Sequence, residues 1–136
     1  MASQIARQII STVKAPLAAS ILSQAVRVDH TLYISGQVGV NPETSQIVEG
    51  GVVAEAHQVL KNIGSVLEAA GSSYDKVVKA TVLLKDINDF AAVNEVYASY
   101  FPTVKPARMA YQVVALPRGA NVEIEAVAVV GDLEDV

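Results

Sequence analysis

The residues best suited to chemistry are an arginine and a glutamate in the C-terminal third of the chain. Arg108 follows Lys105-Pro106-Ala107, and Glu123 lies 15 residues later, in the strand-like segment 122–129. Turn-forming residues at 116–121 separate them, a pattern that favours a hairpin bringing a cation near a carboxylate. Arginine can hold a carboxylate through two parallel hydrogen bonds, and glutamate can activate water. The pair predicts a site for a small carboxylate-bearing substrate.

A second glutamate follows in the same segment. Glu123 and Glu125 share one face of the expected strand, because side chains repeat every two residues. The structural alternative is that both lie on the wet face of a half-buried strand, with Val122, Ile124 and Ala126 in the core. Our hypothesis assigns the chemistry to Glu123 rather than to Glu125.

Composition predicts a single domain, residues 1–136, that associates with copies of itself. Hydrophobic residues make up 51% of the chain and charged residues 18%, against about 25% charged in a typical domain. A chain of this length leaves part of that apolar surface exposed, and large exposed apolar patches mark contact sites. We therefore expect a homo-oligomer.

Several classes of site are disfavoured. The chain has no cysteine, which excludes disulfides, thiolate metal ligands and a cysteine nucleophile. Its two histidines, His30 and His57, are far apart and lack a matching carboxylate pattern, so we expect no metal site. Ser35 has no evident His/Asp partners for a triad. The net charge of −4 without a basic run argues against nucleic acid, and no apolar run is long enough to span a membrane.

The hydrophobic pattern alternates strands with helices. Expected strands cover 5–13, two short segments around Asp29-His30, 76–84, 108–114 and 121–130, and expected helices cover 52–70 and the segment from Phe90 to Pro102. Gly71 is placed to end the first helix, and Gly64 inside it predicts close packing on a sheet. This order indicates an α+β fold with the helices on one face of a sheet, leaving the other face for a partner subunit.

The N-terminal segment allows two interpretations of location. No acidic residue precedes Asp29, whereas Arg7, Lys14 and several hydroxyl residues do. We interpret 5–13 as a strand, because β-branched residues dominate it. The alternative is an organelle transit peptide. We therefore expect a cytoplasmic protein, with a mitochondrial location as the alternative.

Short motifs along nearly the whole chain resemble the Rid family of reactive-intermediate deaminases, also called the YjgF/YER057c/UK114 family, and its animal branch most of all. The matching motifs are Lys14-Ala15-Pro16, Tyr33-Ile34-Ser35-Gly36-Gln37, Lys85-Asp86-Ile87-Asn88-Asp89-Phe90, Val93-Asn94, Tyr100-Phe101, Pro106-Ala107-Arg108, Ala115-Leu116-Pro117 and Val122-Glu123-Ile124-Glu125-Ala126.

The resemblance implies a chorismate-mutase-like mixed sheet with two helices packed on one face, assembling as a homotrimer with clefts between subunits. It implies cofactor-free hydrolysis of 2-imino acids, such as 2-iminopropanoate and 2-iminobutanoate, to 2-oxo acids and ammonia. Such imines escape from pyridoxal-phosphate-dependent dehydratases, so the reaction detoxifies reactive metabolites. The residues implied are Arg108 on the carboxylate, Glu123 on the water, and Ser35, Gly36, Gln37 and Asn94 around the substrate.

The chain departs from the family pattern at two positions, one in the N-terminal segment and one before Pro106. Leu22 stands where the family's cleft tyrosine is expected, and Lys105 replaces a phenylalanine often found before Pro106-Ala107-Arg108. The loss of that hydroxyl favours one alternative, a non-enzymatic ligand-binding or chaperone-like trimer. A second alternative, also associated with the family, is a ribonuclease that inhibits translation.

Overall fold

A computed structural model describes residues 3–136 of the chain. Within them the longer elements follow one another as β1 (Arg7–Ile10), β2 (Ala25–Val28), β3 (Thr31–Gln37), α1 (Gly51–Ala69), β6 (Val77–Leu84), α2 (Phe90–Tyr100), β7 (Ala107–Gln112) and β8 (Val122–Val129). Two short strands, β4 (Val40–Asn41) and β5 (Gln46–Ile47), form a separate hairpin. The first strand is shorter than the expected 5–13, and the small hairpin was not foreseen.

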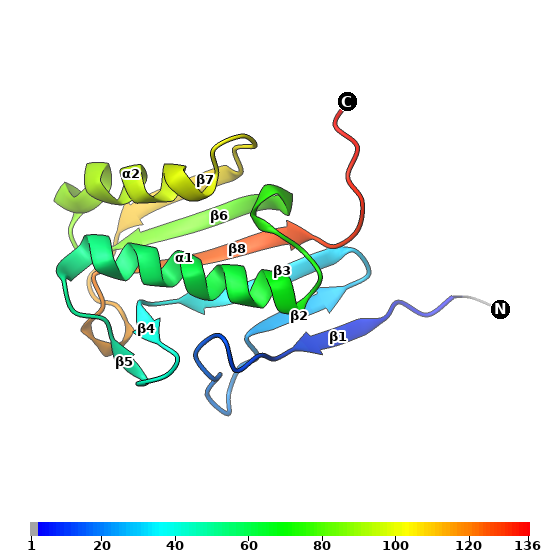
Figure 1. The fold of residues 1–136 in the computed structure, drawn as a ribbon, viewed down its shortest axis with the longest axis horizontal. Helices are drawn as coiled ribbons and strands as arrows, with labels where there is room; N and C mark the ends of the chain where they lie inside the picture. Colours follow the sequence, from blue (N-terminus) through cyan, green and yellow to red (C-terminus); the bar gives the residue numbers. More distant parts are fainter. Residues whose placement is uncertain (1–2) are drawn as a thin grey trace.

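In the described residues, six strands form one mixed sheet in the order β1-β2-β3-β8-β6-β7. Its neighbouring strands are antiparallel except β6 and β7, which run parallel. Parallel neighbours need a long crossover, and the segment containing α2 supplies it between them (Figure 1). The strand β8 lies at the centre of the sheet, although it comes last in the chain.

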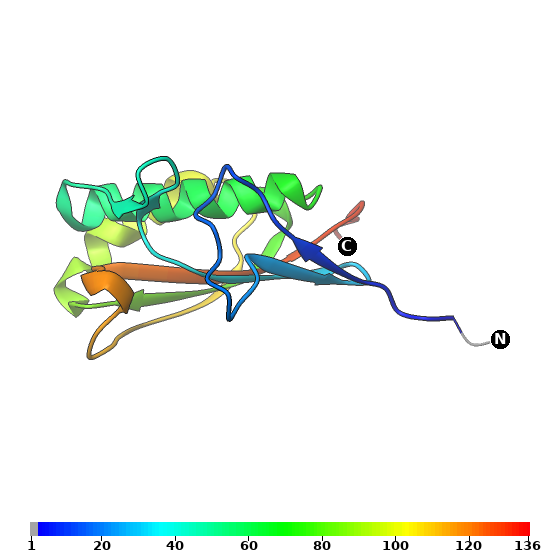
Figure 2. The same cartoon turned by 90° about the horizontal axis from the view of Figure 1, so that it is seen from below.

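The helices α1 and α2 lie on the same side of the sheet (Figure 2). Residues at every second position of β8 face them and are buried, namely Val122, Ile124, Ala126 and Ala128. The helix α1 contributes a buried stripe that includes Leu60, Ile63 and Leu67, as its periodicity predicted. Val53, seven residues before Leu60 on the same helix, is 45% exposed and lies outside this stripe. The expected α+β class, with helices on one face of a mixed sheet, is confirmed.

The other face of the sheet presents large apolar side chains to solvent. Tyr33, Val78, Met109 and Tyr111 are each 44–58% exposed. Tyr33 alternates with buried Leu32 and Ile34 along β3, so it points away from the helices. We call this surface the open face. Its apolar character is what the composition predicted for a chain that associates.

The glycine inside α1 is required by an aromatic side chain rather than by a strand. A Cβ at Gly64 would lie 2.1 Å from the Tyr74 hydroxyl oxygen, and that hydroxyl donates to the Leu60 carbonyl at 2.6 Å. Burial, with a further contribution from Tyr100, raises the pKa of Tyr74 to about 12, so the hydroxyl stays protonated as a donor. The expectation that Gly64 packs on the sheet is therefore wrong. At the C-terminal end, Gly71 has φ of 77° and ends the helix as predicted.

Gly64→Ala is expected to lower the free energy of unfolding by about 1–2 kcal/mol. Alanine would normally favour an exposed helix by up to ~1 kcal/mol, but here its methyl group displaces Tyr74 and costs the hydrogen bond and local packing. Urea denaturation measures the change. Ser65→Ala, one position along, is the control and should be neutral or stabilising. A stabilising Gly64→Ala would contradict the packing argument.

Candidate functional site

Arg108 and Glu123 do not come together within one chain. The strand β6 lies between β7 and β8, so the expected hairpin is wrong. Arg108 pairs with Ala80, which is buried on the helix side of the sheet. Glu123 pairs with Leu83 and alternates with buried Val122, so it points to the open face. The two side chains leave opposite faces of the sheet, and each belongs to a separate half-site.

The arginine half-site is built from β7 and α2. The Arg108 guanidinium carbon lies 4.8 Å from the centre of the Tyr97 ring and 5.6 Å from that of Phe90. At such distances aromatic rings attract a cation through their negative faces. Among residues 3–136 no carboxylate forms an ion pair with this guanidinium. The rings therefore hold Arg108 in place, and within residues 3–136 its charge has no carboxylate partner.

Tyr97 is the more buried of the two ring partners. It is 9% exposed, and within the described part of the chain its hydroxyl has no hydrogen-bond partner. Burial raises the pKa of Tyr97, and the nearby Arg108 charge opposes that rise. Phe90 and Tyr97 lie seven residues apart on the helix expected from Phe90 to Pro102, but their contact with Arg108 depends on how α2 lies against β7.

Asn94 belongs to the same side of α2. It lies four residues after Phe90 and three before Tyr97, and residues at these spacings are neighbours on a helix surface. The side chain is half-buried. Asn94 is therefore placed with the arginine half-site, as a candidate hydrogen-bonding group beside the guanidinium.

The glutamate half-site is built from β8 and β3. The pairing of these strands shifts register between Ile34 and Gln37, which places Gly36 inside an irregular stretch of β3 rather than at its end. A Cβ at Gly36 would lie 3.0 Å from Oε2 of Glu123. Glycine is thus what allows the carboxyl group to lie against the β3 backbone. Burial raises the pKa of Glu123, and the neighbouring charge of Glu125 raises it further.

Ser35 and Gln37 flank that glycine and differ in their surroundings. The Ser35 hydroxyl donates to the Ser23 carbonyl at 2.6 Å, and its backbone N–H donates to the Gln24 carbonyl. Ser35 therefore fastens the preceding loop to β3. Gln37 is 7% exposed and lines a cavity beside Glu123.

That cavity, with a volume of about 290 Å³, lies between the N-terminal loop and the ends of β3 and β8. Leu22 is in its wall, together with Gln37, Arg118 and Glu123. The described residues thus assemble a pocket around Glu123 that excludes Arg108. A site containing both predicted residues requires a second copy of the chain.

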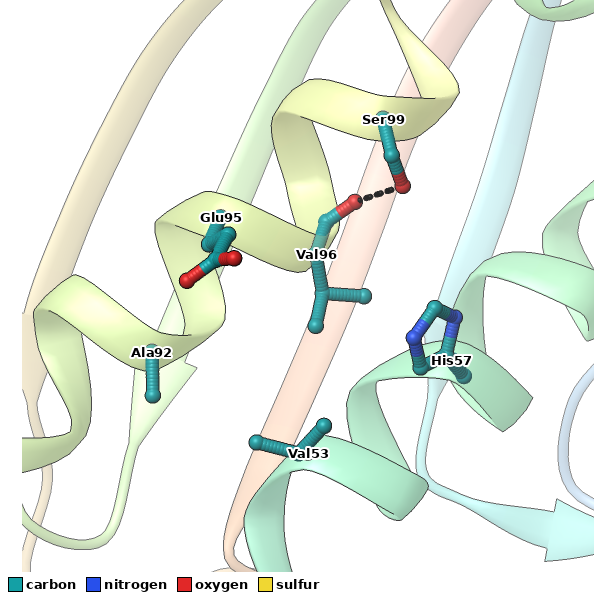
Figure 3. Close-up of a pocket in the computed structure, with 6 residues that line it drawn as sticks. All are labelled: Val53, His57, Ala92, Glu95, Val96 and Ser99. Carbon is teal, nitrogen blue, oxygen red and sulfur yellow. Dashed lines mark hydrogen bonds between the residues drawn. The ribbon is translucent and has the colours of Figure 1, made fainter.

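A second hollow, of about 350 Å³, lies between α1 and α2 on the outer side of the helix layer (Figure 3). Val53 and His57 line it from α1, and Glu95 and Val96 from α2. None of the site residues expected from the sequence lines it. The ring nitrogen Nδ1 of His57 lies 3.1 Å from the Tyr100 hydroxyl, so the histidine is tied to an aromatic neighbour.

No helix in the described part of the chain is long and apolar enough to cross a membrane.

The fold and the divided site define a class: a small α+β domain with a ring-stacked arginine and a half-buried glutamate on opposite faces of one sheet. The Endoribonuclease L-PSP family model matches residues 12–130, and the chain belongs to that family. The resemblance to Rid proteins is thereby confirmed by independent comparison.

Named relatives support the same assignment. The chain is 61% identical over 129 residues to a mouse protein named 2-iminobutanoate/2-iminopropanoate deaminase, covering 95% of this chain and 96% of the mouse protein. A human protein of the same name is 58% identical over 131 residues, with 96% of both chains covered. The crystal structure of RidA from an Antarctic Psychrobacter superposes with a TM-score of 0.87 at 50% identity, covering 90% of this chain and 99% of that one.

Proposed function

We propose that this protein hydrolyses 2-imino acids, including 2-iminopropanoate and 2-iminobutanoate, to 2-oxo acids and ammonia. The observation that carries the proposal is the pair of half-sites. Arg108 is a ring-stacked cation without a carboxylate partner among residues 3–136, and Glu123 is a half-buried carboxyl group lying in a pocket. A substrate with a carboxylate next to an imine requires a cation to bind the carboxylate and a base to activate water, and these two groups supply them. The names of the mouse and human relatives point to the same reaction.

The working assembly is a homotrimer with its sites in clefts between subunits. Arg108 and Glu123 leave opposite faces of one sheet, so a complete site combines Arg108 of one copy with Glu123 of the next. The open face supports this arrangement, because Tyr33, Met109 and Tyr111 expose apolar surface that association would bury. Light scattering should return three times the 14.3 kDa chain mass.

The chemistry divides between the half-sites. Arg108 forms two hydrogen bonds to the substrate carboxylate, and Asn94 lies beside it to fix orientation. Glu123 takes a proton from water as the water oxygen bonds to the imine carbon. The C=N electron pair moves to nitrogen, which receives that proton from Glu123 to give the carbinolamine. The carbinolamine then collapses: Glu123 takes the hydroxyl proton and passes it to the amino nitrogen, and ammonia leaves as the C–N bond breaks and the carbonyl forms. No cofactor takes part.

Holding the imine and the water together accounts for much of the expected acceleration. Gly36 lets the Glu123 carboxyl lie flat against β3, and Gln37 is positioned at the cavity wall. Ser35 contributes through the loop that it fastens.

The experiment that tests the function is deamination of 2-iminobutanoate generated in situ by an amino-acid oxidase. The expected result is 2-oxobutanoate and ammonia formation well above spontaneous hydrolysis. A folded protein that gives no acceleration would overturn the proposal. RNA cleavage should be absent, because the chain carries a net charge of −4.

A further inference from the structure

The cavity beside Glu123 has a wall that is mostly apolar. Its apolar members come from the N-terminal loop, from the end of β3 and from the turn before β8, namely Pro16, Leu17, Leu22, Val38, Val40 and Pro117. Leu17 is 76% exposed and Leu22 is 49% exposed, so both present apolar surface to water. Covering that surface with an apolar group is favourable by about 25 cal/mol per Å².

The loop that carries these leucines is held by a buried glutamine. Gln24 is 2% exposed, and its amide nitrogen donates to the carbonyls of Pro16 at 2.7 Å and Thr12 at 3.0 Å. Its side-chain oxygen accepts from the Thr12 N–H at 2.7 Å. The wall is therefore formed before a ligand arrives, which reduces the ordering cost of binding.

The Glu123 carboxylate disfavours an anionic occupant of the cavity. Glu123 would repel a second carboxylate, and its pKa is already raised by burial and by Glu125. The Arg118 guanidinium donates to the Ser45 carbonyl at 2.7 Å, which directs one of its N–H groups away from the cavity. The occupant best suited to this wall is uncharged and apolar.

The chemistry of a 2-imino acid assigns that occupant. Its imine carbon is planar and carries three substituents: the nitrogen, the carboxylate and the side chain. In the proposed cleft the carboxylate lies on Arg108 of a second copy, and water attacks the carbon from the side of Glu123. The remaining substituent, the side chain, is then free to lie along the wall that Leu22 and Leu17 form.

We propose that this cavity receives the substrate's side chain and makes the protein selective for branched apolar 2-imino acids over 2-iminopropanoate, with Leu22 as a specificity-determining residue. The inference rests on the proposed deaminase function. The volume of about 290 Å³ is roughly ten times a water molecule's share of the liquid, ample for the four carbons of an isobutyl group. The methyl group of 2-iminopropanoate would leave most of the apolar wall exposed to water.

The test compares kcat/KM for 2-imino-4-methylpentanoate and 2-iminopropanoate, made in situ from leucine and alanine. We expect the native protein to favour the larger imine by about 10- to 100-fold, the discrimination that a few methylene groups give in an apolar pocket. Leu22→Ser should bring this ratio down toward one, because a hydroxyl replaces the isobutyl wall. Leu22→Trp should lower it as well, because the indole fills the cavity and excludes the larger side chain.

Leu133→Ser is the matched control. Leu133 is 48% exposed, close to the value for Leu22, but lies beyond the end of β8 remote from Glu123. Its substitution should leave both kcat/KM values unchanged, and thermal unfolding should show that every variant is folded. A native ratio near one, or a ratio unaffected by both Leu22 variants, overturns the inference while the deaminase proposal stands. If the native protein turns over neither imine, both the deaminase proposal and this inference are overturned.

Discussion

Arg108→Ala is expected to lower kcat/KM for 2-iminobutanoate by about 10²- to 10³-fold. The guanidinium makes two charge-assisted hydrogen bonds to the substrate carboxylate in the proposed site, and hydrogen bonds to charged groups contribute roughly 1.5–3 kcal/mol each. Alanine removes both bonds and leaves the faces of Phe90 and Tyr97 without their cation. Steady-state kinetics with in situ imine generation measures the loss.

Two further variants make that result specific. Arg108→Lys retains a charge but not the two-pronged geometry, so activity should recover only in part. Arg27→Ala removes a half-buried arginine that donates to the Asp29 carbonyl, and it should leave kcat/KM unchanged. Arg108→Ala protein should keep the native oligomer mass. If the substitution dissolves the assembly instead, Arg108 is a scaffold residue and our division between site and framework is wrong.

Glu123→Gln is expected to lower kcat by about 10²- to 10⁴-fold, the range for loss of a general base. Glutamine keeps the size of the side chain and its position against Gly36, but it cannot accept a proton from water. Glu125→Gln is the matched control, because it makes the same change on the same strand face at an exposed position. Retention of near-native kcat by Glu123→Gln would remove this residue from the mechanism.

The pH profile of the native enzyme offers a second check on Glu123. The reaction needs the carboxylate form, so activity falls as pH drops through the Glu123 pKa. Burial and the charge of Glu125 both raise that pKa, which places the acid limb above the range of an ordinary glutamate. Glu125→Gln removes the second cause and should shift the acid limb to lower pH. If the acid limb of the pH profile does not shift in Glu125→Gln, a group other than Glu123 controls it.

Much of the local structure could be predicted from the sequence, because it depends on neighbours along the chain. The stripe of Leu60, Ile63 and Leu67 repeats at helical spacing, and Gly71 adopts the positive φ that ends α1. The alternation around Ile124 predicted a strand with one buried face. The short motifs identified the family, which the family model confirms, and the resemblance supported the choice of Arg108 and Glu123 as candidate site residues.

What the sequence alone did not determine was strand order, and strand order decides the site. Because a turn separates Arg108 from Glu123, the sequence predicted that their strands form a hairpin. In the structure β6, which precedes both strands in the chain, lies between them and pairs with each. Such pairing depends on which apolar faces bury most surface together, a property of the whole sheet that no local window contains. Tertiary structure therefore decided that the half-sites lie on opposite faces, that Phe90 and Tyr97 hold the arginine, and that Leu22 lines a cavity beside Glu123.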